Sequence, residues 1–235
     1  ATLNDGTTIL RGAIANAFKA PTPYQLFSDF GNVSLVPEEG NSSEIGVEQA
    51  FFAQKLVVSL TVFERDASNQ IDFVSCFRNT SAICIGRPFG TYNNIARTKT
   101  EGTEASFEAK PTERLSLSGS YSSLNARNDV VNSPNYNRCL PRRPDHTSFV
   151  SIGYAFTSGL DISATRSSTG ASFDNASNSI RVKGYNLLTL RASQKLGEHW
   201  TLYGRIENAS DEDYEVVRSY GSLPRQTFVG LRASF

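Results

Sequence analysis

The dominant feature of the chain is a period-two alternation of apolar and polar residues, repeated many times with turn residues between the repeats. Within 115–122, Leu115, Leu117 and Tyr121 occupy odd positions, and serines fill the even ones. The segments 159–165 and 229–235 repeat this pattern. Because successive side chains of a β-strand point to opposite faces, the alternation predicts strands with one apolar and one polar face.

This pattern predicts about ten strands and no helix of three turns. The predicted strands are 7–19, 42–53, 55–74, 92–109, 114–127, 144–156, 159–169, 180–194, 199–209 and 223–235. Several are longer than the 5–6 residues usual in soluble proteins and match the 9–11 that a tilted strand needs to cross a bilayer. The predicted fold class is all-β, an antiparallel up-and-down transmembrane β-barrel.

The connectors alternate between short and long, which supports a membrane meander with tight turns on one side and long loops on the other. The aromatic residues Trp200, Tyr154 and Phe156 fall at short-turn ends, where an interfacial aromatic girdle would lie. Alternation alone also fits a soluble β-sandwich, in which two apolar faces pack on each other. That alternative remains open at this point.

Composition narrows the possible functions. Lys and Arg number 23, as do Asp and Glu, and this zero net charge argues against a nucleic-acid binder. Hydrophobic residues make up 39% and mean hydropathy is −0.32, which does not exclude a barrel because half of each strand faces a polar lumen.

Neither metal-ligand spacing nor a phosphate-binding loop occurs, and the one possible start of a catalytic site is His146 beside Asp145. We therefore expect no enzyme, no cofactor and no metal site.

Three cysteines occur, and two of them lie close together in a polar loop. Cys76 and Cys84 are predicted to form a short-range disulfide, which requires an oxidising compartment. The alternative is three unrelated thiols. Cys139 is then either free or paired elsewhere.

Several motifs in one register resemble the TonB-dependent receptor barrels. They are a Phe-Lys-Ala-Pro-Thr run at 18–22, a Gly-Asn pair at 31–32, a Pro-Glu pair at 37–38 and a Glu-Ile-Gly-Val-Glu run at 44–48. The run at 207–214 is similar to the family's Asn-Leu-Phe-Asp-x-x-Tyr segment, with Ala209 and Ser210 in place of Leu and Phe.

The resemblance covers 1–235 and implies the C-terminal portion of a probable 22-stranded barrel, without the plug domain. It implies the outer membrane of a Gram-negative bacterium and TonB-dependent uptake of a scarce solute, such as a ferric siderophore or cobalamin. The implied partners are outer-membrane lipid, an extracellular small-molecule ligand, the plug domain, the TonB complex and the barrel assembly machinery. The alternative is a passive porin or small structural barrel, favoured if about ten strands close on themselves.

Aromatic and arginine side chains of the long loops are the predicted ligand contacts, because a site uses them to hold a bulky, partly anionic solute. They are Tyr24, Phe27, Arg87, Tyr92, Tyr136, Arg218 and Tyr220. For each of them, an ordinary place on the rim is the alternative.

Two further predictions concern the strands themselves. The last strand ends in alternating apolar residues and Phe235, which resembles the assembly signal of outer-membrane barrels, read by strand addition. Charged strand positions are predicted to form a solvated, charge-balanced wall around the lumen. They are Arg97, Lys99, Glu101, Arg191, Arg205, Glu207 and Arg232.

Overall fold

The computed structural model describes residues 1–77 and 82–234, and within them the chain forms one 11-stranded antiparallel sheet. Its strands are β1 (Thr2–Leu3), β2 (Thr8–Lys19), β3 (Glu38–Phe51), β4 (Leu56–Ser75), β5 (Gly90–Ala109), β6 (Leu115–Asn128), β7 (His146–Ala155), β8 (Leu160–Thr169), β11 (Tyr185–Leu196), β12 (Trp200–Glu207) and β13 (Gln226–Ala233). A separate hairpin consists of β9 (Ser172–Phe173) and β10 (Arg181–Val182).

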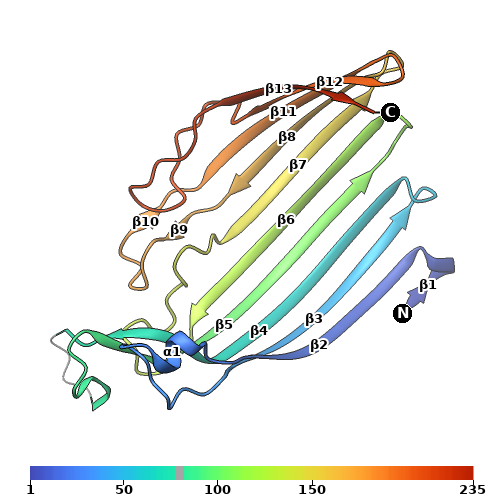
Figure 1. Ribbon diagram of the computed structural model, residues 1–235. Coiled ribbons are helices and arrows are strands. Elements are labelled where there is room, and N and C mark those ends of the chain that lie inside the picture. Colours follow the sequence, from blue (N-terminus) through green and yellow to red (C-terminus); the bar gives the residue numbers. More distant parts are fainter. Residues whose placement is uncertain (78–81, 235) are drawn as a thin grey trace.

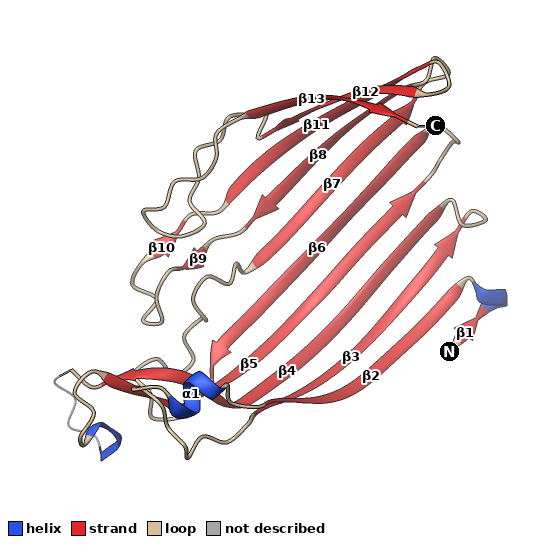
Figure 2. Ribbon diagram, viewed as in Figure 1, coloured by secondary structure: helices blue, strands red, loops and turns tan. Residues whose placement is uncertain are grey.

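The predicted all-β meander is confirmed, because the main strands pair with their neighbours in chain order. Each of the ten predicted ranges overlaps one of them. The boundaries differ from the predicted ones by a few residues. For example, β3 begins at Glu38 and not at residue 42, and its first residue, Glu38, forms an ion pair with Lys19 of β2 at 3.3 Å. In the part of the chain that the structure describes, helix is confined to α1 (Pro23–Phe27) and two 3-10 turns, Asn4–Gly6 and Ala82–Cys84 (Figure 2). Among the described residues, none of these helices has the length and apolar content to span a membrane.

The sheet is curved and open. Short turns gather at one end of the strands and long loops at the other (Figure 1). In the described part of the chain, β1 and β13 stand at the two edges of the sheet and do not pair with each other. The closed ten-stranded barrel that would have favoured a passive porin is therefore not formed by this chain.

One face of the sheet is apolar near the short turns. On β4 this face carries Leu56, Val58, Leu60 and Val62, and the strand register places Val47 and Ala105 beside Leu60. These side chains are not covered by protein, since Leu60 is 45% exposed. In a soluble sandwich they would pack on a second sheet, so the open apolar face requires a lipid solvent instead.

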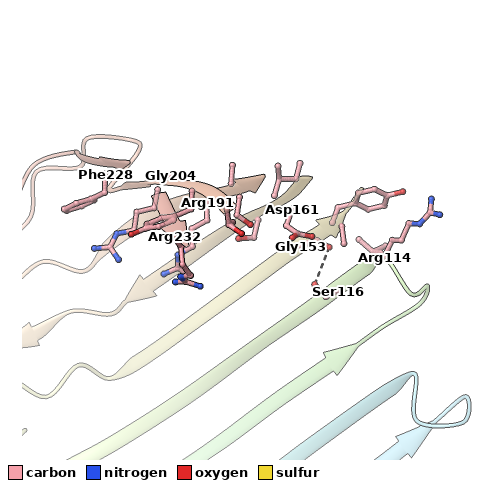
Figure 3. A pocket seen from close by; sticks show the side chains of 18 of the residues that line it. Arg114, Ser116, Gly153, Asp161, Arg191, Gly204, Phe228 and Arg232 are labelled. Atoms are coloured by element: carbon pink, nitrogen blue, oxygen red, sulfur yellow. Dashed lines mark hydrogen bonds between the residues drawn. The ribbon is translucent and has the colours of Figure 1, made fainter. Parts of the chain in front are cut away.

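The opposite, polar face is concave, because its side chains from β6 through β13 together line one hollow (Figure 3). Arg191, Arg205, Glu207 and Arg232 lie on this face, as predicted.

The predicted lumen positions of Lys99 and Glu101 are wrong. Both lie on the same face as Ala105, so they project outward, beyond the apolar stripe. There Lys99 Nζ lies 2.7 Å from Glu64 and 3.0 Å from Glu101. β4 and β5, each 20 residues long, extend beyond the roughly 9–11 residues that cross a bilayer, so their outward face turns polar where they leave the apolar belt.

Candidate functional site

The first long loop and the β4–β5 hairpin form one unit beyond the apolar belt. We call it the headpiece and define it as residues 20–37, 68–77 and 82–94. The ladder between β4 and β5 is interrupted by a bulge between Ala67 and Ile71, and beyond it the hairpin bends away from the sheet (Figure 1). The helix α1 lies against this bent hairpin (Figure 1). Bulges bend a strand and increase its local twist, which accounts for the change of direction.

The short helix α1 forms because its first turn is well capped. The Thr22 hydroxyl accepts a hydrogen bond from the backbone N–H of Gln25 at 3.2 Å, and the Gln25 side chain accepts one from the Thr22 N–H at 2.9 Å. Pro23 takes the first helical position, where its missing N–H costs nothing. The helix therefore presents Tyr24 and Phe27 at fixed positions.

Buried hydrogen bonds attach the first loop to β5. The Asn32 side chain, 8% exposed, donates to the carbonyl of Tyr92 at 3.0 Å. The hydroxyl of Thr91, which is fully buried, donates to the carbonyl of Phe30 at 3.1 Å, and the Tyr92 N–H donates to the same carbonyl. A buried polar group is costly to leave unpaired, so these bonds hold the loop in one arrangement.

Four aromatic rings meet on this support. Tyr24 contacts Tyr92 edge-to-face with centroids 6.2 Å apart, Tyr92 contacts Phe73 at 5.5 Å, and Phe73 contacts Phe30 at 5.7 Å. Tyr24 remains exposed on one side, as does the neighbouring Phe27. The cluster gives a rigid aromatic surface open to the exterior.

The predicted disulfide between Cys76 and Cys84 is confirmed and closes the tip of the headpiece, with a Cα–Cα distance of 5.3 Å. The Arg87 guanidinium donates to the Thr91 hydroxyl, which brings Arg87 beside the aromatic cluster. Cys139 carries a free thiol.

The predicted contact residues fall into three places. Tyr24, Phe27, Arg87 and Tyr92 belong to the headpiece. Tyr136 lies in the loop after β6 and lines a hollow of about 210 Å³ together with other residues of β5, β6 and that loop.

The last long loop holds the remaining two predicted contacts. Arg218 forms an ion pair with Glu215 at 3.2 Å, and Tyr220 is 72% exposed. Phe235, the predicted assembly signal, lies outside the described residues.

Phe73, Asn32 and Thr91 are parts of the headpiece that the sequence analysis did not predict. Phe73 enters the cluster because the β4–β5 register places it directly opposite Tyr92. That register depends on the bulge, which alternation alone does not locate. Within residues 1–77 and 82–234, no group of three His, Cys, Asp or Glu side chains is arranged to hold a metal ion.

A second concave feature lies inside the curve of the sheet. It is a hollow of about 880 Å³ on the polar face, lined by residues from the β5–β6 turn to β13 (Figure 3). Its lining includes Arg191, Arg205 and Arg232. The interior of the curve is therefore polar and charged.

The family comparison decides what this sheet belongs to. Residues 2–209 match the family model described as TonB dependent receptor-like, beta-barrel. The chain belongs to the TonB-dependent receptors. Members of this family are outer-membrane β-barrel proteins of Gram-negative bacteria, so the apolar face meets outer-membrane lipid and the long loops lie outside the cell.

Relatives of known role include receptors for different solutes. The vitamin B12 transporter BtuB of Photobacterium profundum is 28% identical over 222 residues, which cover 93% of this chain and 34% of the relative. Among solved structures, the siderophore receptor PiuA of Acinetobacter baumannii has a TM-score of 0.77 at 16% identity, with 97% of this chain and 34% of that one covered. The pyoverdine receptor FpvA of Pseudomonas aeruginosa has a TM-score of 0.75 at 19% identity, with 99% and 34% covered. The chain thus spans about a third of the length of these TonB-dependent receptors.

Proposed function

We propose that the chain is the C-terminal part of the barrel of a TonB-dependent receptor that binds a scarce, bulky solute outside the cell and passes it inward. The solute is of the cobalamin or ferric-siderophore class, and the energy comes from the TonB complex. The protein is a transporter and catalyses no reaction. Phe235 and the last strand serve as the signal read by the assembly machinery.

The observation that carries the proposal is the headpiece. Its rings are held above the apolar belt by buried hydrogen bonds and a disulfide, so they are ordered before any ligand arrives. A preorganised surface loses little conformational entropy on binding, which suits capture of a solute at low concentration. Tyr24 and Phe27 offer ring faces to a large planar or catechol-bearing ligand, and Arg87 offers a positive charge.

Uptake by the complete receptor tests the function. The receptor is produced in a Gram-negative host that lacks its own cobalamin and siderophore receptors, and uptake of labelled cobalamin and a panel of ferric siderophores is followed. We expect saturable uptake of one solute class that disappears when TonB is deleted. Non-saturable, TonB-independent entry of small solutes would instead indicate a passive porin.

Substitution of the exposed rings tests the site. Tyr24→Ala and Phe27→Ala should each weaken binding of the transported solute up to about tenfold, the value of a well-placed aromatic contact. Val131→Ala, which shortens an exposed apolar side chain of another loop, is the control and should leave binding unchanged. Unchanged affinity in both ring variants would remove the headpiece from the binding site.

A further inference from the structure

A small hollow lies on the outward side of the sheet, at the end where β6 runs into its long loop. It has a volume of about 210 Å³ and is lined by residues of β5, β6 and that loop. The β5–β6 register pairs Lys99 with Arg127. In the same register Glu101 is paired with Asn125. Because Lys99 and Glu101 project outward, the hollow opens on the membrane side of the sheet and not into the lumen.

The hollow lies at the height of the lipid headgroups of the outer leaflet. The outward face of β6 carries leucine, glycine and tyrosine from Leu115 to Tyr121, and it is polar from Ser123 onward. A tilted strand crosses the hydrocarbon core in about 9–11 residues, which is the length of β6 from Leu115, beside the short turn, to Asn125. The hollow therefore lies just beyond the acyl chains.

The loop wall of the hollow is held in place by hydrogen bonds and an ion pair. The Asn137 N–H donates to the carbonyl of Asn128 at 2.8 Å. Asp129 is joined twice to Arg97 of β5, by an ion pair at 3.0 Å and by its N–H, which donates to the Arg97 carbonyl at 2.8 Å. Arg97 therefore lies beside this outward hollow, and its predicted position in the lumen wall is wrong. The loop presents Tyr136 on a fixed support.

The lining has the composition of a saccharide site. The ring of Tyr136, which is 51% exposed, offers an apolar face on which a sugar ring can stack. Amide and carboxylate groups surround it, and such groups exchange hydrogen bonds with sugar hydroxyls. They belong to Glu101, Asn125, Asn128, Asp129 and Asn137. A sugar ring has apolar faces and a polar edge, so it matches both kinds of lining.

One cation in the hollow is oriented but not neutralised. The Arg127 Nε–H donates to the side-chain oxygen of Asn125 at 2.7 Å, and its Nη1 donates to the carbonyl of Asn137 at 2.7 Å. Both acceptors are neutral, and Arg127 has no ion-pair partner in the described part of the chain. Lys99, in contrast, pairs with two carboxylates. An ordered guanidinium of uncompensated charge suits a phosphate, whose oxygens accept hydrogen bonds from its remaining N–H groups.

We propose that this hollow binds the phosphorylated sugar headgroup of an outer-leaflet glycolipid. Tyr136 stacks on a sugar ring, Arg127 binds its phosphate, and the acyl chains lie against the apolar face below. The occupant is a lipid and not a soluble saccharide, because the hollow adjoins the apolar belt and a glycolipid contacts both surfaces at once. The proposal uses the outer-membrane location of the family and does not depend on which solute is transported.

The test uses the complete receptor, purified in detergent and stripped of lipid, with lipopolysaccharide that lacks O-antigen as the probe in native mass spectrometry. Tyr136→Ala and Arg127→Gln should each weaken binding about tenfold, through loss of a stacked ring or of a charge-assisted contact. Tyr136→Phe keeps the ring and should keep the affinity. The matched controls are Tyr220→Ala in the last loop and Arg181→Gln on β10, both at exposed positions, and they should bind as the wild type does.

Lipid variants identify the part of the ligand that each side chain recognises. The same glycolipid without its phosphates should bind about tenfold more weakly, and Arg127→Gln should weaken it no further. Phosphatidylglycerol, which has a phosphate and no sugar ring, should bind weakly whether or not Tyr136 is replaced.

Two results would overturn the proposal. One is unchanged affinity in both Tyr136→Ala and Arg127→Gln receptors that keep their heat-modifiable gel mobility. The other is equally tight binding of the deacylated saccharide, which would make the hollow a site for a soluble sugar. None of these measurements involves the transported solute or TonB, so failure of the proposed function is detected separately.

Discussion

At the residue scale, glycines facing aromatic rings recur in this sheet. Phe63 lies opposite Gly102, Phe107 opposite Gly119, and Tyr203 opposite Gly230. In each pair an added Cβ would lie within 2.5 Å of the ring. The ring therefore covers the backbone of the neighbouring strand, which shields its hydrogen bonds and fixes the ring orientation.

The first prediction follows from the contact between Gly102 and Phe63. Gly102→Ala should destabilise the receptor by about 1–3 kcal/mol, because the new methyl group meets both the Phe63 ring and the carbonyl of Ser123 at 2.7 Å. Urea unfolding of receptor refolded in vesicles measures this. Gly12→Ala is the control, since its nearest neighbour is a carbonyl oxygen 3.8 Å away. Equal stability of the two variants would contradict the packing described.

The second prediction separates the two faces of one strand. Leu60→Arg puts a charge into lipid between Val47 and Ala105 and should cost about 2–4 kcal/mol near the bilayer midplane. Thr61→Arg points into the lumen opposite Glu104 and should be tolerated. The same unfolding assay compares them. Equal damage from both substitutions would count against the assignment of faces.

At the scale of elements, the headpiece depends on a few buried polar groups. Asn32→Asp replaces a donor to the Tyr92 carbonyl with a carboxylate, so two oxygens face each other. We expect loss of amide-exchange protection in residues 24–35. The control is Asn93→Asp, one residue after Tyr92, because the Asn93 side chain makes no hydrogen bond in the described structure. Full protection in the Asn32 variant would show that this bond does not hold the loop.

The disulfide gives a chemical prediction for the same element. Alkylation of the denatured receptor without reduction should label Cys139 but neither Cys76 nor Cys84. Replacing both bonded cysteines with serine should lower the free energy of local unfolding of the tip by about 2–3 kcal/mol, because the disulfide removes the conformational entropy of a short loop from the unfolded state. Mass spectrometry of peptides reads the labelling, and label on all three cysteines would refute the bond.

The sequence predicted the strands far better than the headpiece. Alternation located ten of the eleven strands of the sheet and missed only the two-residue β1, because lipid on one face and water on the other impose a period of two on residues such as 115–121. The sequence analysis assigned Lys99 and Glu101 to the wrong face of the sheet. Alternation assigns a residue to a face by comparison with its apolar neighbours, and these two residues lie beyond the apolar belt, where the outward face is also polar. The aromatic cluster depends on a bulge and on contacts between residues about 60 positions apart, such as Asn32 with Tyr92. Neither leaves a periodic signal.

At the scale of the whole molecule, the open edges are the main feature. β1 and β13 each present an unpaired row of backbone groups in the described sheet, and such edges cannot be left in lipid. We expect this 235-residue chain, produced alone, not to give the heat-modifiable gel band of a closed barrel. Co-production with the remaining strands of the receptor should restore it. A heat-modifiable band from the chain alone would contradict the open sheet.

The bulge between Ala67 and Ile71 is the point at which the hairpin changes direction relative to the rest of the sheet, so it sets the angle of the headpiece. The arm from Gln70 to the disulfide at Cys76 is about 20 Å long, so a turn of about 10° at this fulcrum moves the tip by roughly 3 Å. No hydrogen-bonded pair within the membrane has to shift for this displacement. A change of angle at this joint would leave the membrane-embedded strands in place, because the irregular register is confined to a few residues.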